Sequence, residues 1–496
     1  MLRTRLLPAL AAGALVAAAA GAAAPPANHH PELQAIAAAV KASNLRATDV
    51  ALVGFGTRHT LSTTTSETRG IGAARRWVAA QFKTISNGCG GCLEIVTPSQ
   101  VFTGKRMPKV GAEVMNVVAI QRGTSDPDRV IVMTAHLDSR NTDVMDATGL
   151  APGANDDAAG VAALIETARV LSQYKFPATL VYSADSGEEQ GLYGGKIIAQ
   201  YAVDHGWNVE ANLNNDMVGN SHGGDGVHDP HTLRVFSEGT KTNETLEQAA
   251  YRRYHGGGVD SPSRNIARYM AVLADHYLDN FHVRMVYRTD RWGRSGDQVP
   301  FLEQGFPAVR LSEAHENYSH QHQNVTVVDG VKHGDVIAGV DFDYLANVTR
   351  LDAITMASLA LAPMPPADLT VEGAVSYDTT LAWKPSPGAA SYHAWWRETT
   401  APQWQHEYVA GDVDKVVLKD IILDDYFFGV SAVSADGWES PAEFPGFAGS
   451  FARSPKRGPD GKPADVLYPD RSDKFGGDAI GQPSWRKATG QDGRAQ

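Results

Sequence analysis

Acidic and histidine side chains recur where apolar segments of the chain run out. The segment VIVMTAHLDSR carries His136 and Asp138, YSADSGEEQG carries the adjacent pair Glu188 and Glu189, and NLNNDMVGN carries Asp216. Carboxylates and imidazoles are common ligands of divalent metals, and zinc is favoured where histidine takes part. Buried carboxylates that stay charged are costly unless a cation lies among them. The pattern therefore indicates a metal site suited to hydrolysis.

Two further segments extend this set of ligands. The loop APGANDDAAG adds Asp156 and Asp157 just before a predicted helix. Alone, Asp156 could simply cap that helix, and His136 alone could be a structural histidine. Four such segments in one chain are harder to explain as separate structural features. The segment SEAHENYSHQHQNV supplies further imidazoles at His315, His320 and His322.

Alternating strands and helices are expected to position these side chains. Apolar runs at 113–120, 129–136 and 178–185 predict strands, and helical periodicity predicts helices over 30–48, 67–85 and the segment that follows Asp157. This order predicts an α/β domain with a mixed, largely parallel sheet flanked by helices. Sites in such sheets gather outside the carboxyl ends of the strands, so residues far apart in sequence are expected to converge there.

The composition changes along the chain and predicts several parts. Residues 30–360 form the predicted catalytic domain, and the Pro-rich stretch 361–368 is a predicted linker. Residues 366–449 contain short alternating strands typical of a small all-β sandwich, and they resemble a fibronectin type III module. The polar, Gly- and Pro-rich residues 450–496 are predicted to be a disordered tail.

The first 22 residues have the pattern of a secretory signal peptide. Arg3 and Arg5 precede an alanine-rich apolar run that ends in small residues, with cleavage expected near Ala22. A membrane anchor is the disfavoured alternative, because the strongly apolar part is short and diluted by alanine. Only two cysteines occur, Cys89 and Cys92, and in an exported chain they favour a local disulfide. We expect a secreted or periplasmic protein without a membrane span after signal cleavage.

Length and charge exclude some functions. The chain has 496 residues, enough for a catalytic domain and an accessory one. Its net charge of −12 argues against nucleic acid as a partner, since such binding requires a basic face.

Several motifs together resemble one enzyme family. HLDS, GANDDAAGVAALIETARVL, EEQGLYGG, NNDMVG and SGDQVPFLEQGFPAVRL occur in order over roughly residues 50–355 and are similar to the M28 metallopeptidases, zinc aminopeptidases with a co-catalytic metal pair. The resemblance implies a zinc exopeptidase type of fold, two zinc ions per chain and hydrolysis of N-terminal residues from peptides.

The resemblance also implies a role for each matching residue. His136 and Asp216 would bind one zinc, Glu189 the other, and Asp156 would bridge both. Either His320 or His322 would complete the second site, and the sequence leaves that choice open.

Glu188 and Asp138 have implied roles beside the metals. Glu188 would act as general base toward the attacking water. Asp138 would accept the ring N–H of His136 and fix its orientation. The chain departs from the family pattern at Asp297-Gln298, which concerns a contact beside the pocket, and at Asn324, which concerns the support of the last histidine.

Two alternatives compete with the aminopeptidase hypothesis. A glutaminyl cyclase-like enzyme would use a single zinc to close an N-terminal glutamine. A catalytically inactive binding protein is the other alternative, since the sandwich module could bind a protein or a cell-wall component. Residues 286–297 are a candidate lining of the substrate pocket, or else an ordinary surface loop.

Overall fold

The computed structural model describes residues 30–453 and 477–487. The signal peptide predicted over residues 1–22 lies outside these ranges. Within them, no helix combines the length and apolar character needed to cross a membrane.

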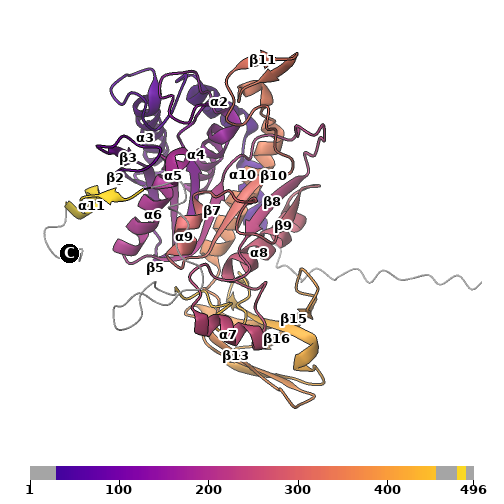
Figure 1. The fold of residues 1–496 in the computed structure, drawn as a ribbon. Helices are drawn as coiled ribbons and strands as arrows, with labels where there is room; N and C mark the ends of the chain where they lie inside the picture. Colours follow the sequence, from indigo (N-terminus) through magenta and orange to yellow (C-terminus); the bar gives the residue numbers. More distant parts are fainter. Residues whose placement is uncertain (1–29, 454–476, 488–496) are drawn as a thin grey trace, which may run out of the picture.

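A mixed sheet of eight strands forms the centre of the larger domain (Figure 1). Its contacts are parallel between β6 and β5, β5 and β7, β7 and β10, and β8 and β9, and antiparallel at the other three. The predicted mixed, largely parallel α/β sheet is therefore confirmed. In spatial order the strands are β1 (Glu94–Val96), β4 (Val117–Gln121), β6 (Ala178–Asp185), β5 (Asp126–His136), β7 (Asn208–Asn215), β10 (Ala308–Glu313), β8 (Thr232–Ser237) and β9 (His282–Val286).

Helices cover both faces of this sheet because its strands are apolar on both sides. Along β5, Ile131 and Met133 face one hydrophobic core, whereas Val130 and Val132 face the other. The first core is covered by α1 (Pro31–Ala39), α2 (Ala42–Val53), α3 (Gly70–Gly88), α4 (Ala159–Leu171), α8 (Pro262–Tyr277) and α10 (Phe342–Leu361). The second is covered by α6 (Tyr193–Asp204) and α9 (Gln298–Glu303).

The single helix predicted over 30–48 is wrong, because the chain breaks into α1 and α2 at Val40 and Lys41. Both residues have extended backbone angles. The Lys41 N–H donates to the Glu166 carboxylate of α4 at 2.9 Å, and the Asn44 side chain donates to the same carboxylate at 3.0 Å. This contact between distant segments replaces the helical hydrogen bonds at the break.

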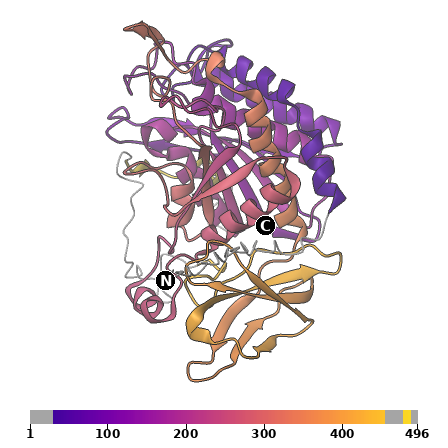
Figure 2. The same ribbon diagram turned by 90° about the vertical axis from the view of Figure 1, so that its right-hand side faces the viewer.

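The smaller domain is a β-sandwich of two three-stranded antiparallel sheets, which lies below the larger domain in Figure 2. Leu381 and Trp383 from one sheet pack against Tyr392 and Phe428 from the other in a shared core. The predicted sandwich is present, and its likeness to fibronectin type III stays a prediction. The sheets are β13 (Ala367–Glu372), β14 (Thr379–Lys384), β17 (Lys415–Leu418) and β16 (His406–Gly411), β15 (Ala389–Glu398), β18 (Tyr426–Ser434).

A buried ion-pair cluster joins the two domains. Asp260 accepts from Arg268 of α8 at 2.9 Å and from Arg397 of β15 at 2.6 Å, and all three side chains are almost fully buried. Such a cluster is costly to break, because removal of one partner leaves a buried charge without compensation. These contacts connect β15 of the sandwich to α8 of the larger domain.

The disordered tail predicted over 450–496 is wrong for residues 450–453, where Phe451 is buried in the first core, and for residues 477–487. There β19 (Ala479–Ile480) pairs with β2 (Ser99–Phe102), and α11 (Ser484–Lys487) follows. Trp485 packs against the second core, and Arg486 forms an ion pair with Asp204 at 2.6 Å. β2 also pairs with β3 (Ala112–Met115). β19 therefore supports the loop that joins β2 to β3. Residues 454–476 and 488–496 of the predicted tail lie outside the described residues.

Asp352 on α10 makes stability depend on pH. Its side chain is fully buried, one carboxylate oxygen lacks a hydrogen-bond partner, and the other accepts from Asn215 at 3.2 Å. Burial raises its pKa to about 8, although the Asn215 hydrogen bond lowers it. Between the unfolded pKa of about 4 and about 8, the folded chain holds a proton that the unfolded chain has lost. The free energy of unfolding therefore falls as pH rises through this window.

Asp352→Asn is expected to stabilise the protein at pH 8 by about 1–3 kcal/mol and to have much less effect at pH 5. The neutral amide removes the cost of ionising a buried group. The measurement is the difference in free energy of unfolding between variant and wild type at each pH, with the exposed Asp436→Asn as control. An equal effect at both values would contradict this assignment.

Candidate metal centre

The strand order explains why the predicted ligands converge. β6, β5, β7 and β10 are consecutive parallel neighbours, so their carboxyl ends lie at one edge of the sheet. His136 is the last residue of β5, Asp216 follows β7, and the two glutamates follow β6. The histidine-rich segment follows β10. The predicted convergence therefore results from the topology.

Asp156 stands between two imidazoles. Its Oδ1 lies 2.9 Å from Nε2 of His136, and its Oδ2 lies 3.0 Å from Nε2 of His322. Gln321 also donates to Oδ2 at 3.2 Å. Each oxygen of one carboxylate thus faces a different imidazole, which is the arrangement that a bridging ligand requires.

Asp157 takes the capping role that was considered for its neighbour. It lies with Asp156 in the irregular turn η1 (Ala154–Ala158) that leads into α4. Its Oδ1 accepts from the N–H of Gly160 at 3.2 Å, and its Oδ2 accepts from the N–H of His136 at 2.9 Å. Because Asp157 holds the start of α4 and the end of β5 together, Asp156 is left to face the imidazoles.

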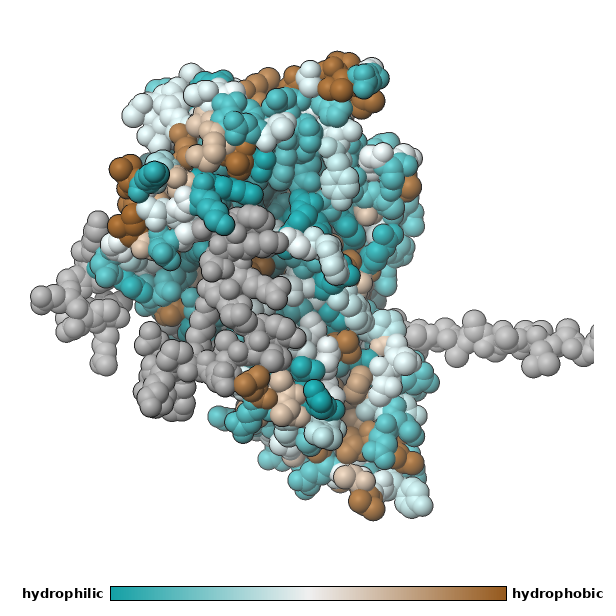
Figure 3. All heavy atoms as spheres, viewed as in Figure 1, coloured by the Kyte–Doolittle hydropathy of each residue, from teal (hydrophilic) through white to brown (hydrophobic). Residues whose placement is uncertain are grey.

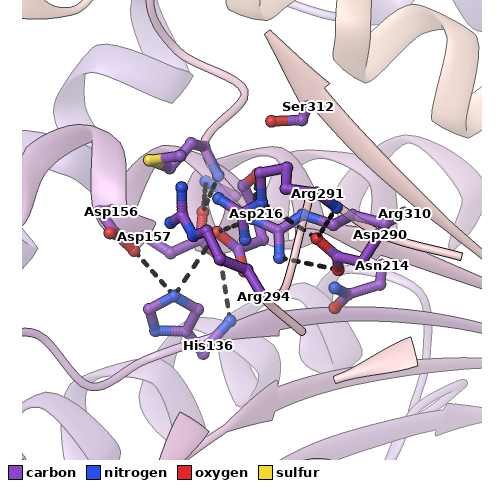
Figure 4. Close-up of polar contacts among 12 residues, drawn as sticks. His136, Asp156, Asp157, Asn214, Asp216, Asp290, Arg291, Arg294, Arg310 and Ser312 are labelled. Carbon is purple, nitrogen blue, oxygen red and sulfur yellow. Dashed lines mark hydrogen bonds and ion pairs between the residues drawn. The ribbon is translucent and has the colours of Figure 1, made fainter. Parts of the chain in front are cut away.

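Asp216 completes a first group of ligands. Its Oδ1 lies 3.9 Å from Nε2 of His136 and 2.8 Å from the guanidinium of Arg310 on β10. Figure 4 shows Asp216 with His136 on one side and the arginines on the other. The first group comprises His136, Asp156 and Asp216, whose donor atoms lie within 4.8 Å of one another.

The two adjacent glutamates separate in space. Both lie on the short helix α5 (Glu188–Gly191). Oε1 of Glu189 lies 2.9 Å from Nε2 of His322, whereas Glu188 lines the cavity and is partly exposed. The second group is therefore Asp156, Glu189 and His322, again within 4.8 Å. Glu188 belongs to neither group.

The choice between the two downstream histidines falls on His322. His320 is in neither group, and burial together with the nearby His333 lowers the pKa of its imidazole. Asn324 accepts from the N–H of Thr142 at 3.4 Å. Asn324 thus contacts the loop at Thr142 and does not take the expected role of supporting the last histidine.

Asp138 supports the site in two ways. Nδ1 of His136 lies 3.0 Å from the backbone carbonyl of Asp138 and 3.7 Å from its carboxylate, so the carbonyl is the closer acceptor. The carboxylate accepts instead from the N–H groups of Glu188 and Glu189, at 3.2 and 3.3 Å, and from the Thr60 hydroxyl at 2.8 Å. Asp138 thus links the end of β5 to the glutamate pair.

The donor atoms fit divalent cations. Tetrahedral zinc with bonds of about 2.0–2.2 Å separates its ligand atoms by roughly 3.3–3.6 Å. The contacts of 2.9–3.9 Å in the two groups bracket that separation. Each group offers three protein ligands, which leaves one open position, as in catalytic zinc sites. A cavity of about 210 Å³ lies at the two groups.

The electrostatics of the site favour cations. Burial lowers the pKa of His322, but Glu189 and Asp156 raise it more, to about 10. Burial raises the pKa of Glu188 to about 8, with His136 opposing and Asp216 adding to the rise. The same field that holds protons here attracts a metal ion, which must displace the proton from His322.

Unusual backbone conformations border the centre. Leu192, Met217 and His322 have positive φ angles of 56–57°, in the left-handed region that non-glycine residues rarely adopt. Leu192 lines the cavity, Met217 follows the candidate ligand Asp216, and His322 belongs to the second candidate group. Strained residues of this kind cluster at functional sites, where the surrounding structure holds them.

Several supporting residues escaped the sequence analysis. Asp335 accepts the N–H groups of Asn155 and Asp156 at 2.7–3.0 Å, which fixes the bridging loop. Arg58 is fully buried and donates to the carbonyls of Leu137, Pro152 and Gly153. One such residue could have been found from the sequence: Arg310 is a charged residue inside the apolar strand PAVRLSE.

The segment 286–297 does line the cavity, through Arg291, Gly293, Arg294 and Ser295. Asp297 is buried, and its Oδ1 accepts from the N–H of Gly195 at 3.2 Å. Gln298 donates to Asp290 at 2.6 Å. The two residues that depart from the family pattern, Asp297 and Gln298, therefore hold segments next to the cavity in place.

Comparisons with known proteins find a matching family model and similar proteins. The model of peptidase family M28 matches residues 116–330, a range that contains all the ligands of both groups. A probable zinc metalloprotease of Leptosphaeria maculans is 43% identical over 84% of this chain and 96% of its own length. One from Pyricularia oryzae is 42% identical over 84% of each chain. Among solved structures, the LapA aminopeptidase of Legionella pneumophila matches 67% of this chain and 76% of its own, with 20% identity and a TM-score of 0.47.

Proposed function

The chain belongs to peptidase family M28, and from this premise we propose that it is an exported, zinc-dependent aminopeptidase with two zinc ions. The observation that carries the proposal is Asp156, whose two oxygens face one imidazole each in two separate groups of ligands. The names of the similar fungal proteins support zinc as the metal. A complete second group favours hydrolysis over the single-zinc cyclase alternative.

The residues of the chain divide the chemistry among them. Bound zinc supplies an activated water near neutral pH and polarises the scissile carbonyl. Glu188 lies free of the ligand groups and faces the cavity, so its carboxylate can accept the proton of the water and return it to the leaving amine. The proposal assigns the free α-amine of the substrate to the carboxylates around the centre, which supports action at the N-terminus.

Export is supported by two features. The pattern of residues 1–22 is that of a signal peptide. Cys89 and Cys92 form the predicted disulfide, the state expected in an oxidising compartment.

The test is hydrolysis of aminoacyl-nitroanilides by zinc-loaded and chelated protein. We expect turnover with zinc, loss of turnover after chelation, and none on N-acetylated substrates, because the acetyl group removes the α-amine. Glutamine-start peptides are included to detect cyclisation. Cleavage of acetylated or internal bonds at equal rates would contradict the aminopeptidase proposal, and cyclisation without hydrolysis would support the cyclase.

A further inference from the structure

Four arginines line the cavity at the metal centre: Arg106, Arg140, Arg291 and Arg294. They come from three separate segments, namely the loop between β2 and β3, the loop after β5 and the loop between β9 and α9. The lining also contains four carboxylates, which belong to Asp156, Glu188, Glu189 and Asp216. These four would serve as metal ligands or as the base, and two divalent cations would balance their charge.

One pair of arginines lies beside the Asp216 group. Arg294 and Arg291 share Glu316, at 2.9 and 3.5 Å, and Arg291 also contacts Asp290 at 3.0 Å. Glu316 is in turn shared with Arg234 at 2.8 Å.

Figure 4 shows Arg291, Arg294 and Arg310 close to Asp216 and Asp290. Positive charge exceeds negative charge among these side chains and their ion-pair partners. Arg310 pairs with Asp216 at 2.8 Å and lies 3.4 Å from Asp290, so Asp290 and Glu316 are left to balance three further guanidinium groups, those of Arg234, Arg291 and Arg294. Although burial raises the pKa of Glu316, Arg291 and its neighbours lower it to about 2.

The other pair lies beside Glu189. Arg106 donates to the backbone carbonyl of Glu189 at 2.8 Å. Arg140 donates to the carbonyls of Asn141 and Thr142, both at 3.1 Å, which hold its guanidinium in place. Among the described residues, Glu189 offers the one carboxylate within 4.0 Å of Arg140, and that carboxylate is a metal ligand.

The rest of the lining offers little to an apolar side chain. Leu192 is the single large apolar residue among the described residues that line the cavity. Pockets that select apolar groups are walled mainly by apolar and aromatic side chains. Figure 3 shows the exposed apolar groups elsewhere, including a brown patch at the top of the view, where the β11 (Thr326–Val328) and β12 (Val331–His333) hairpin exposes Val327, Val328 and Val331.

We propose that this site selects peptides that carry a carboxylate next to the scissile bond, held by the cavity arginines. The inference rests on the proposed peptidase function and names its substrate class. Guanidinium groups bind carboxylates through paired, charge-assisted hydrogen bonds. The carboxylate has two possible sources, the side chain of an N-terminal Asp or Glu, and the free C-terminus of a short peptide.

The first measurement is calorimetric binding of free Asp and Glu against Asn and Gln to the zinc-loaded protein. The second compares kcat/KM for nitroanilides of the same four amino acids and of Leu, which have no C-terminal carboxylate. The third compares Ala-Ala with its C-terminal amide. The affinity or kcat/KM for the acid is expected to exceed that for the amide by roughly tenfold or more. This difference should appear either between Asp or Glu and their amides, or between Ala-Ala and its C-terminal amide.

Arg140→Gln and Arg294→Gln are each expected to bring the ratio of acid to amide toward one. The change is expected in KM more than in kcat. Arg122→Gln, an exposed arginine paired with Glu94 away from the cavity, is the control and keeps the preference. Equal binding and turnover of acids and amides in every arm would overturn the inference. Acid-selective binding without any turnover would support the inference and contradict the peptidase function, so the two failures are distinguishable.

Discussion

Glu188→Gln is expected to retain both zinc ions and to lose turnover by about 10²–10⁴-fold. Glu188 belongs to neither group of ligands and lines the cavity next to them. Glutamine has nearly the same shape but cannot accept a proton, so the step that activates the water is lost while the metal ligands stay. The measurement is kcat on an aminoacyl-nitroanilide together with a zinc count on the same sample.

Glu94→Gln provides a matched control, because this exposed glutamate pairs with Arg122 away from the cavity. We expect the control to keep both zinc and turnover. Two outcomes would contradict the assignment of the base: wild-type turnover in Glu188→Gln, or a loss of activity that simply follows a loss of zinc.

Asp156→Asn is expected to lower zinc from two ions per chain to below one and to abolish activity. Each oxygen of Asp156 faces a different imidazole. The amide offers one neutral oxygen in place of a carboxylate whose charge is shared over two, so one group loses its ligand and the other keeps only a weaker one. The measurement is zinc content by mass spectrometry, with circular dichroism to verify that the variant is folded.

The two downstream histidines give this experiment its internal comparison. His322→Gln removes a ligand from the second group alone, so about one ion is expected to remain. His320→Gln lies outside both groups and is expected to keep two. An Asp156→Asn protein with two tightly bound ions would contradict the bridging role.

The sequence predicts that the candidate ligands converge, because one topological rule brings them together. His136 ends β5, whereas Glu189 and Asp216 follow β6 and β7, so the positions of these candidate ligands follow from the order of the strands. Asp156 enters from the loop before α4, which packs on the same sheet.

What the sequence leaves open depends on contacts between distant segments. His320 and His322 are two residues apart, and only the path of the loop decides which imidazole meets Glu189. Likewise, the division of work between Asp156 and Asp157 depends on which carboxylate points toward Gly160. The composition of residues 477–487 suggested disorder, but Trp485 packs against the second core, a contact with a distant segment.

The most direct test of the central claim is a crystal structure of the zinc-loaded protein with anomalous data at the zinc edge. Two peaks about 3.5–4 Å apart are expected, with Asp156 between them, His136 and Asp216 at one, and Glu189 and His322 at the other. A single peak, or two peaks of which Asp156 touches only one, would contradict the account.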